Sequence, residues 1–478
     1  MDRRGSGRLN AMLDRAAAWG QDHILRRVVR NSSYLFASNA ISALMVILTS
    51  RLLGVSAFGA LGAITVLVSN VNRLLSFRMS DVVVRYMGEY MERKEYDRAA
   101  ALVKAAGVAE GITSLVAFGV LVLVAPLGAA FIIHDPSSTP LIVFYGISIL
   151  GNITTETATG VLMVTNHYRS QALINLLQAV LVAVMIAAAF LSHAGLYMVL
   201  TAYLVGKMIL GLGPIAVALY HMFKLFGSRW WRAPLDLLPP RRELVRFALS
   251  TNFSGTVNLI VRDSEVLWVS GIFNTTYAGY YKAALNIIQL VVMPINPFVS
   301  TTYPELNRAI VSRQWERLRS LIRRVTTIAA GWTGGAGLLL LLFGRQIIFT
   351  PWSFFGHPFL LFGRAFSPFK PAFLPAYPAM LVLLIGFGVA NILFWNRSLC
   401  LAFGLPDYPL KVYFWGMVVK VALTLTIVRP FGPNGYIVEA LLLSAFFVVT
   451  VGLTVWRGLK EIGRLSALEP AAPAGAVE

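Results

Sequence analysis

Residues 252–304 read NFSGTVNLIVRDSEVLWVSGIFNTTYAGYYKAALNIIQLVVMPINPFVSTTYP, two apolar runs joined by a short polar turn. Each run is long enough for a helix that crosses a bilayer, yet ionisable residues interrupt both. They are Arg262, Asp263 and Glu265 in the first run and Lys282 in the second. A charge at bilayer depth costs at least about 2.5–3.5 kcal/mol unless it faces a bundle interior or a water-filled cavity. The stretch therefore predicts two adjacent transmembrane helices that border a polar cavity, with the remaining helices as its wall.

The composition of the 478-residue chain is that of a membrane protein. The chain is 57% hydrophobic and 13% charged, whereas soluble domains are about 25% charged. Apolar runs recur that can each cross a hydrocarbon core of about 30 Å, and we expect an all-α polytopic membrane protein with twelve transmembrane helices. The single cysteine, Cys400, lies in an apolar run, and the histidines lack ligand spacing. The sequence thus predicts neither a disulfide nor a metal site.

The hydropathy pattern divides the chain into five segments. They are a basic amphipathic segment 1–33, an N-terminal six-helix lobe 34–220, a linker 221–245, a C-terminal six-helix lobe 246–456 and a tail 457–478. Two landmarks recur about 220 residues apart: LGVSAFG at 53–59 matches FNTTYAG at 273–279, and KEYDR at 94–98 matches RQWER at 313–317. We expect two repeats related by an axis along the membrane normal, as in many transporters.

The formal net charge of +19 is unevenly distributed between the predicted loops. Lys and Arg crowd the loops on one side, for example 78–104 and 308–324. The opposite loops carry only Arg345, Arg364, Lys370 and Arg429. In a soluble protein this net charge would suggest nucleic acid, but here it follows the positive-inside rule. We therefore expect no nucleic-acid partner, and a plasma (bacterial cytoplasmic) membrane location with both termini in the cytoplasm.

Several short motifs carry a resemblance to a known family. They are Asn31, Tyr34-Leu35-Phe36, Asn39, Ser50-Arg51-Leu52-Leu53-Gly54, Phe58-Gly59, Glu265-Val266-Leu267-Trp268-Val269 and Gly279-Tyr280-Tyr281-Lys282-Ala283-Ala284. Together they resemble oligosaccharide flippases of the O-antigen/lipid-linked-oligosaccharide type, in the multidrug/oligosaccharidyl-lipid/polysaccharide exporter superfamily. Those proteins usually have Asp where this chain has Glu265, although Asp263 is nearby.

The resemblance implies two six-helix lobes that face each other across a central cavity. It also implies a transporter rather than an enzyme, without a cofactor, that works by alternating access with ion coupling. The implied substrate is a polyprenyl-diphosphate-linked glycan that is flipped, among membrane lipids, from the cytoplasmic to the periplasmic leaflet for cell-surface polysaccharide biosynthesis.

Polar residues recur at helical spacing on several predicted spans. The candidates for substrate binding are Arg262, Lys282, Lys420, Lys207, Arg73, Asn258, Asn286 and Gln289. Cations suit a diphosphate, which arginine binds through paired hydrogen bonds, and amides suit sugar hydroxyls. Alternatively, Arg262 with Glu265, or Asp263 with Lys282, forms a structural ion pair. Arg73 lies near a helix end and is also placed to snorkel to the interface.

The candidates for binding a coupling proton or cation are Glu156, Asp263 and Glu265. Glu156 lies past the midpoint of its predicted span, with threonines on either side and no Lys or Arg within a turn. An unpaired carboxyl at that depth is costly when charged and is suited to reversible protonation. A hydrogen-bonded carboxylic acid between helices is the alternative.

Two other functions stay open on the sequence. A membrane-embedded glycan polymerase or ligase would keep its catalytic groups in a large outer loop, and the candidate is the Phe- and Pro-rich stretch 345–376. That stretch contains His357, Arg364 and Lys370 but no Asp or Glu for acid–base chemistry. A drug exporter of the same superfamily would be expected to have fewer basic residues in its cavity.

Overall fold

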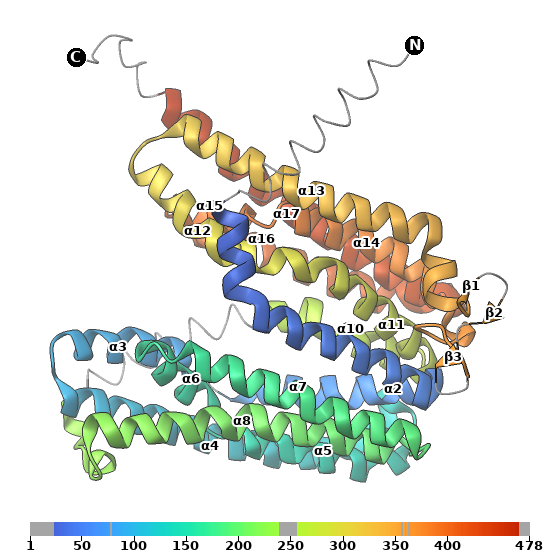
Figure 1. Cartoon of the computed structure of the whole chain (residues 1–478), viewed down its shortest axis with the longest axis horizontal. Coiled ribbons are helices and arrows are strands. Elements are labelled where there is room, and N and C mark those ends of the chain that lie inside the picture. Colours follow the sequence, from blue (N-terminus) through green and yellow to red (C-terminus); the bar gives the residue numbers. More distant parts are fainter. Residues whose placement is uncertain are drawn as a thin grey trace.

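The computed structural model describes residues 23–76, 79–238, 256–354, 357–358, 360–361 and 364–467. Most of the predicted segment 1–33, the end of the linker, residues 246–255 of the predicted C-terminal lobe and half of the tail lie outside these ranges. The described helices form two lobes that touch at one end and diverge at the other (Figure 1). We call these the closed end and the open end.

The N-terminal lobe consists of α2 to α8 and short helical turns. Its elements are α2 (His23–Leu75), α3 (Ser80–Glu92), α4 (Tyr96–Gly128), η1 (Ala129–Ile133), η2 (Pro136–Ser138), α5 (Thr139–Gly151), α6 (Thr155–Val164), α7 (Tyr168–Leu191), α8 (Leu196–Phe226), η3 (Trp230–Arg232) and η4 (Leu235–Leu237). Gly54 divides α2 into two spans, because its φ of 74° is left-handed and bends the chain there. Glycine adopts this conformation without steric cost.

The C-terminal lobe continues from η5 to α17. Its helical elements are η5 (Leu259–Asp263), α10 (Glu265–Ile272), α11 (Thr275–Val292), η6 (Met293–Ile295), α12 (Asn296–Val311), α13 (Trp315–Gly344), η7 (Arg345–Phe349), η8 (Pro371–Phe373), α14 (Ala376–Ile392), α15 (Asn396–Ala402), α16 (Asp407–Leu423), η9 (Thr424–Val428), η10 (Arg429–Asn434) and α17 (Gly435–Ala467). The Phe- and Pro-rich stretch 345–376 contains two small antiparallel pairs, β1 (Ser353–Phe354) with β2 (His357–Pro358), and β3 (Leu360–Leu361) with β4 (Arg364–Ala365). These pairs lie at the closed end (Figure 1).

Nine stretches of the described chain are long and apolar enough to cross a membrane. Two of them, 40–75 and 407–467, each contain two helices. The span that includes η5 and α10 is interrupted by a π-helical turn and completes the twelve. The outward faces of these helices carry exposed apolar side chains, such as Leu123 and Phe131, as expected of surfaces in contact with lipid. The prediction of an all-α polytopic membrane protein is confirmed.

The internal repeat seen in the sequence returns in the backbone. Lys94 and Arg313, in the matched charged segments, both have a left-handed φ, of 60° and 52°, in the same kind of turn between helices. The fourth span of each lobe is also broken, between α5 and α6 and between α14 and α15. The two halves therefore share a backbone plan as well as sequence landmarks.

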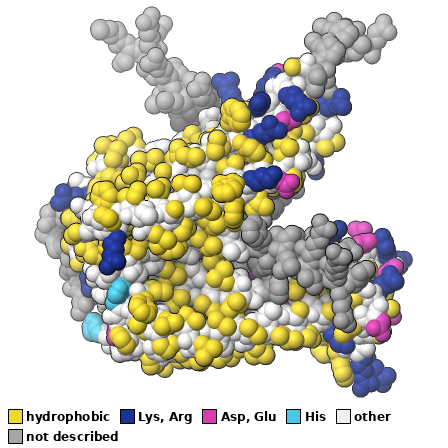
Figure 2. Space-filling model, turned by 180° about the vertical axis from the view of Figure 1, so that it is seen from behind, with side chains coloured by type: hydrophobic (Ala, Val, Ile, Leu, Met, Phe, Trp, Pro, Cys, Tyr) yellow, Lys and Arg dark blue, Asp and Glu magenta, His cyan; other side chains and the backbone are white. Residues whose placement is uncertain are grey.

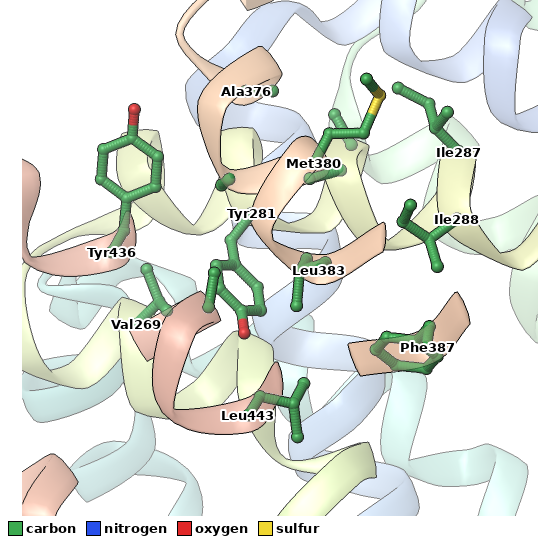
Figure 3. Packing of buried hydrophobic residues seen from close by; sticks show 14 of the residues in the cluster. Val269, Tyr281, Ile287, Ile288, Ala376, Met380, Leu383, Phe387, Tyr436 and Leu443 are labelled. Carbon is green, nitrogen blue, oxygen red and sulfur yellow. The ribbon is translucent and has the colours of Figure 1, made fainter. Parts of the chain in front are cut away.

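Each lobe has its own apolar core. The N-terminal core includes Leu61, Ile64 and Ile142, which are fully buried. The C-terminal core is built around Tyr281 of α11, whose ring lies among Val269, Leu383 and Leu443 (Figure 3). Between the lobes the most extensive packing joins α2 to α11, and this contact forms the closed end.

Candidate functional site

Space-filling atoms show a wedge-shaped recess between the lobes that widens toward the open end (Figure 2). The η5 segment contacts both α2 and α16, so it lies where the two lobes approach each other. Arg262 within η5 and Asn258 just before it have exposed side chains. The guanidinium of Arg262 also stacks on the ring of Phe387, 5.4 Å from its centroid.

Two further exposed cations, Lys207 and Arg73, belong to the N-terminal lobe. Lys207 of α8 is exposed to solvent although protein surrounds it on most sides, and it lies close enough to Arg73 for their charges to interact. Arg73 forms an ion pair with Asp263 of η5, and both side chains are partly exposed. Near this ion pair the amide of Asn70 donates to the Ser264 hydroxyl at 2.8 Å. The ion pair places Arg73 between the lobes, and the substrate-binding roles of Arg262, Lys207 and Arg73 stay predictions.

A second polar centre lies entirely within the C-terminal lobe. The ammonium of Lys420 contacts Glu265 at 2.5 Å and also bonds Glu439. Tyr281 donates its hydroxyl to Glu265, and Thr424 donates to Glu439 at 2.9 Å. The exposed fraction of each of these charged side chains is 2% or less. The cluster joins α10, α11, α16 and α17 through two carboxylates and one ammonium.

This cluster corrects the expectation that Lys420 lines the cavity. The physical reason is that an ammonium at that depth is stabilised by carboxylates, and Lys420 pairs with both Glu265 and Glu439 while its side chain stays 2% exposed. Neither ion pair considered from the sequence forms, because Glu265 bonds Lys420 and Asp263 bonds Arg73. Sequence reasoning missed Glu439, although a lone glutamate in the apolar run of residues 436–449 is a usable signal.

The remaining candidates on α11 lie apart from the recess cations. The Lys282 ammonium sits 4.5 Å from the centroid of the Phe58 ring and 3.5 Å from the Phe58 carbonyl. No carboxylate within the described ranges pairs with it. Asn286 and Gln289 line a mostly apolar cavity of about 640 Å³ between α2, α11 and α13. The Asn286 amide nitrogen is buried there with no hydrogen-bond partner among the described residues.

Glu156 belongs to a polar arrangement that the sequence did not reveal. Its carboxylate accepts a hydrogen bond from the Ser80 hydroxyl at 2.7 Å. The start of α6 is capped by Glu110 of α4, which accepts from the backbone N–H groups of Glu156 and Thr157 at 2.9 and 2.8 Å and from the Thr157 hydroxyl at 2.7 Å. A carboxylate at a helix N-terminus satisfies free N–H groups and complements the helix dipole. Glu110 is 1% exposed.

Metal binding has no support in the parts of the chain that the structure describes. No group of three or more His, Cys, Asp or Glu side chains is arranged there to hold an ion. Cys400 is buried, as expected from its apolar surroundings.

Two repeated six-span lobes around a recess define a class of protein, the multi-pass helical membrane proteins with two pseudo-symmetric lobes. Solved structures with this fold include an inward-facing multidrug resistance MATE family transporter of the MOP superfamily, at 14% identity and a TM-score of 0.66, covering 91% of this chain and 96% of that one. The outward-facing conformation of a multidrug resistance MATE family transporter matches at 14% identity with a TM-score of 0.55, covering 92% of this chain and 96% of that one. A MOP superfamily transporter from Pyrococcus furiosus, whose binding pocket is described as having reverse polarity, matches at 14% identity with a TM-score of 0.58. The match covers 93% of this chain and 96% of that one.

The family of the chain follows from its sequence. Residues 28–309 match the model of the polysaccharide biosynthesis protein family, and the chain belongs to that family. The search among curated proteins gives no match. Family and fold together describe a multi-pass membrane protein of polysaccharide biosynthesis.

Proposed function

We propose that the protein flips a lipid-diphosphate-linked oligosaccharide from the cytoplasmic to the outer leaflet of the bacterial cytoplasmic membrane. The proposal assigns the recess a cationic lining of Arg262, Lys207 and Arg73, and it is supported by the exposure of Arg262 and Lys207 and by the Arg73–Asp263 ion pair between the lobes. A diphosphate has the complementary charge, and guanidinium groups bind phosphate oxygens through paired hydrogen bonds. Membership of a polysaccharide biosynthesis family supports a glycan as the cargo, and Asn258 offers an amide to its hydroxyls.

The open end of the lobes faces the cytoplasm in this proposal. Lys and Arg side chains gather there on both lobes (Figure 2), in keeping with the positive-inside rule, and both chain termini are then cytoplasmic. The conformation is an inward-open state, which the higher TM-score against an inward-facing relative supports. The headgroup enters the recess from the cytoplasmic leaflet, and the lobes then rock to open the other end.

Removing two recess cations tests the proposal. The double variant Arg262→Ala, Lys207→Ala is expected to slow flipping at least about tenfold, because each charge-assisted contact with a diphosphate is worth about 1.5 kcal/mol or more. Flipping is measured in proteoliposomes as protection of a fluorescent polyprenyl-diphosphate oligosaccharide from an external glycosidase. Arg429→Ala, which removes an exposed cation at the closed end, serves as the matched control and should flip normally.

The same assay separates the two transport candidates. Drug export is the second candidate, because structures with this fold include multidrug resistance transporters. If the double variant flips the glycan lipid at the wild-type rate and at equal abundance, the recess cations do not bind the diphosphate. Transport of a cationic drug by the wild-type protein, without flipping of the glycan lipid, would establish the drug exporter instead.

Ion coupling is proposed to involve Glu156, whose carboxylate bonds Ser80 across α6 and α3. Glu156→Gln keeps the shape and an acceptor oxygen but cannot exchange a proton. We expect this variant to fold normally and to lose the response of flipping to an imposed pH gradient. Flipping is compared in proteoliposomes with and without the gradient, with Glu89→Gln on the exposed face of α3 as control. A gradient response equal to that of the wild type removes Glu156 from the mechanism, and Asp263 becomes the next candidate.

A further inference from the structure

The two lobes meet at the closed end through glycines that touch backbone. A Cβ built on Gly59 of α2 would lie 1.8 Å from the Thr275 carbonyl oxygen, and one built on Gly279 of α11 would lie 2.2 Å from the Val55 carbonyl oxygen. Real Cβ atoms are never that close to an oxygen, so no other residue fits without separating the helices. At this crossing α2 and α11 are in direct backbone contact, with no side chain between them.

The crossing is symmetric with respect to the internal repeat. Gly59 and Gly279 occupy the same repeat position, and so do Val55 and Thr275, at the same offset of about 220 residues. Each glycine thus packs on the partner's equivalent carbonyl, as in an isologous twofold contact. Farther along the helices Lys282 packs against Gly62, its own repeat equivalent. A position that contacts its own equivalent lies at the pseudo-twofold axis.

Further side-chain contacts join the two lobes around the crossing. Ser56 Oγ lies 2.9 Å from Thr275 Oγ1. The Phe58 ring meets the rings of Phe369 and Phe373 edge-on, with centroids 6.5 and 5.7 Å away. Arg51, which is 8% exposed, donates a hydrogen bond to the Ser367 carbonyl. Ser367, Phe369 and Phe373 of the C-terminal lobe therefore pack beside the place where the lobes meet.

We propose that the Gly59–Gly279 crossing is the outer gate of the transporter, the contact that must part for the recess to open to the outer side. This inference rests on the alternating-access function proposed above. Because its contacts come in symmetric pairs around one axis, a rigid rotation of one lobe against the other breaks both at once. Because they are backbone contacts, the movement of side chains alone cannot open the crossing.

A disulfide across the crossing tests the gate. The variant Ser56→Cys, Thr275→Cys is made in a Cys400→Ala background and oxidised in proteoliposomes, with thiol loss measured to quantify cross-linking. We expect flipping to be lost in proportion to cross-linking and restored by a reductant. The control pair Thr333→Cys, Asn391→Cys, whose parent side chains bond at 2.8 Å within one lobe, should cross-link without loss of flipping. Wild-type flipping by a fully cross-linked Ser56–Thr275 pair would overturn the gate.

A second measurement does not depend on the cargo. Gly59→Leu should force the helices apart and raise severalfold the labelling of a cysteine at position 56 by a membrane-impermeant maleimide added outside. Gly452→Leu is the matched control, because no atom lies within 4 Å of a Cβ at that glycine. Unchanged labelling in a folded Gly59→Leu protein would refute the gate. A wild-type protein that flips no glycan lipid but shows the labelling change would refute only the proposed cargo.

Discussion

Replacing Lys420 by methionine is expected to destabilise the folded protein by about 3–5 kcal/mol, the usual cost of breaking a buried ion pair by removing one partner. The ammonium is the cation that Glu265 and Glu439 share, and all three side chains are buried. Without it two carboxyl groups remain close together away from water, so that each must take up a proton or separate from the other. Either event loosens the contacts among four helices.

The measurement is thermal unfolding of the purified protein in detergent, followed by the fluorescence of its tryptophans. Lys411→Met is the matched control, because Lys411 lies on the same helix, α16, with an exposed side chain. The triple variant Lys420→Met, Glu265→Gln, Glu439→Gln should recover much of the lost stability, since replacing a whole buried charge cluster is often neutral. If Lys420→Met and Lys411→Met unfold at the same temperature, the cluster does not hold the C-terminal lobe together.

The second large effect is expected at Glu110, the cap of α6. Glu110→Ala leaves the buried N–H of Thr157 and the N–H of Glu156 without their acceptor. Each unsatisfied buried group costs about 1–3 kcal/mol, so the variant should lose several kcal/mol of stability and abundance in the membrane. Glu110→Gln keeps one carbonyl oxygen and should lose less.

Glu89→Ala provides the comparison in the same lobe. Glu89 is exposed and pairs with Arg93 one turn along α3 at 2.7 Å, and such surface pairs contribute about 0–1 kcal/mol. Abundance after membrane extraction and the midpoint of thermal unfolding are measured for all three variants. Equal stability of Glu110→Ala and Glu89→Ala would show that water or another group caps α6 in the absence of Glu110.

The sequence was sufficient for properties that depend on composition and spacing along the chain. Apolar run length indicated the membrane spans, since a helix must match the hydrocarbon thickness. The recurrence of the 53–59 motif at 273–279 indicated a repeated architecture, and the glycines that end these motifs are the residues that meet at the closed end. The cations Arg262, Lys207 and Arg73 were chosen as candidates because charges in apolar spans are rare and costly, and their roles stay predictions.

Tertiary structure alone decided which charges neutralise one another and which remain exposed. Lys420 and Arg262 look alike in the sequence, as single cations in apolar runs. They differ because Glu265 and Glu439 are brought to Lys420 from other helices, whereas Arg262 stays exposed beside Phe387. The same holds for Glu110, whose partners at the start of α6 are about 45 residues away. The energy of a buried charge is set by groups within a few ångströms in space, and the order of residues along one chain does not reveal them.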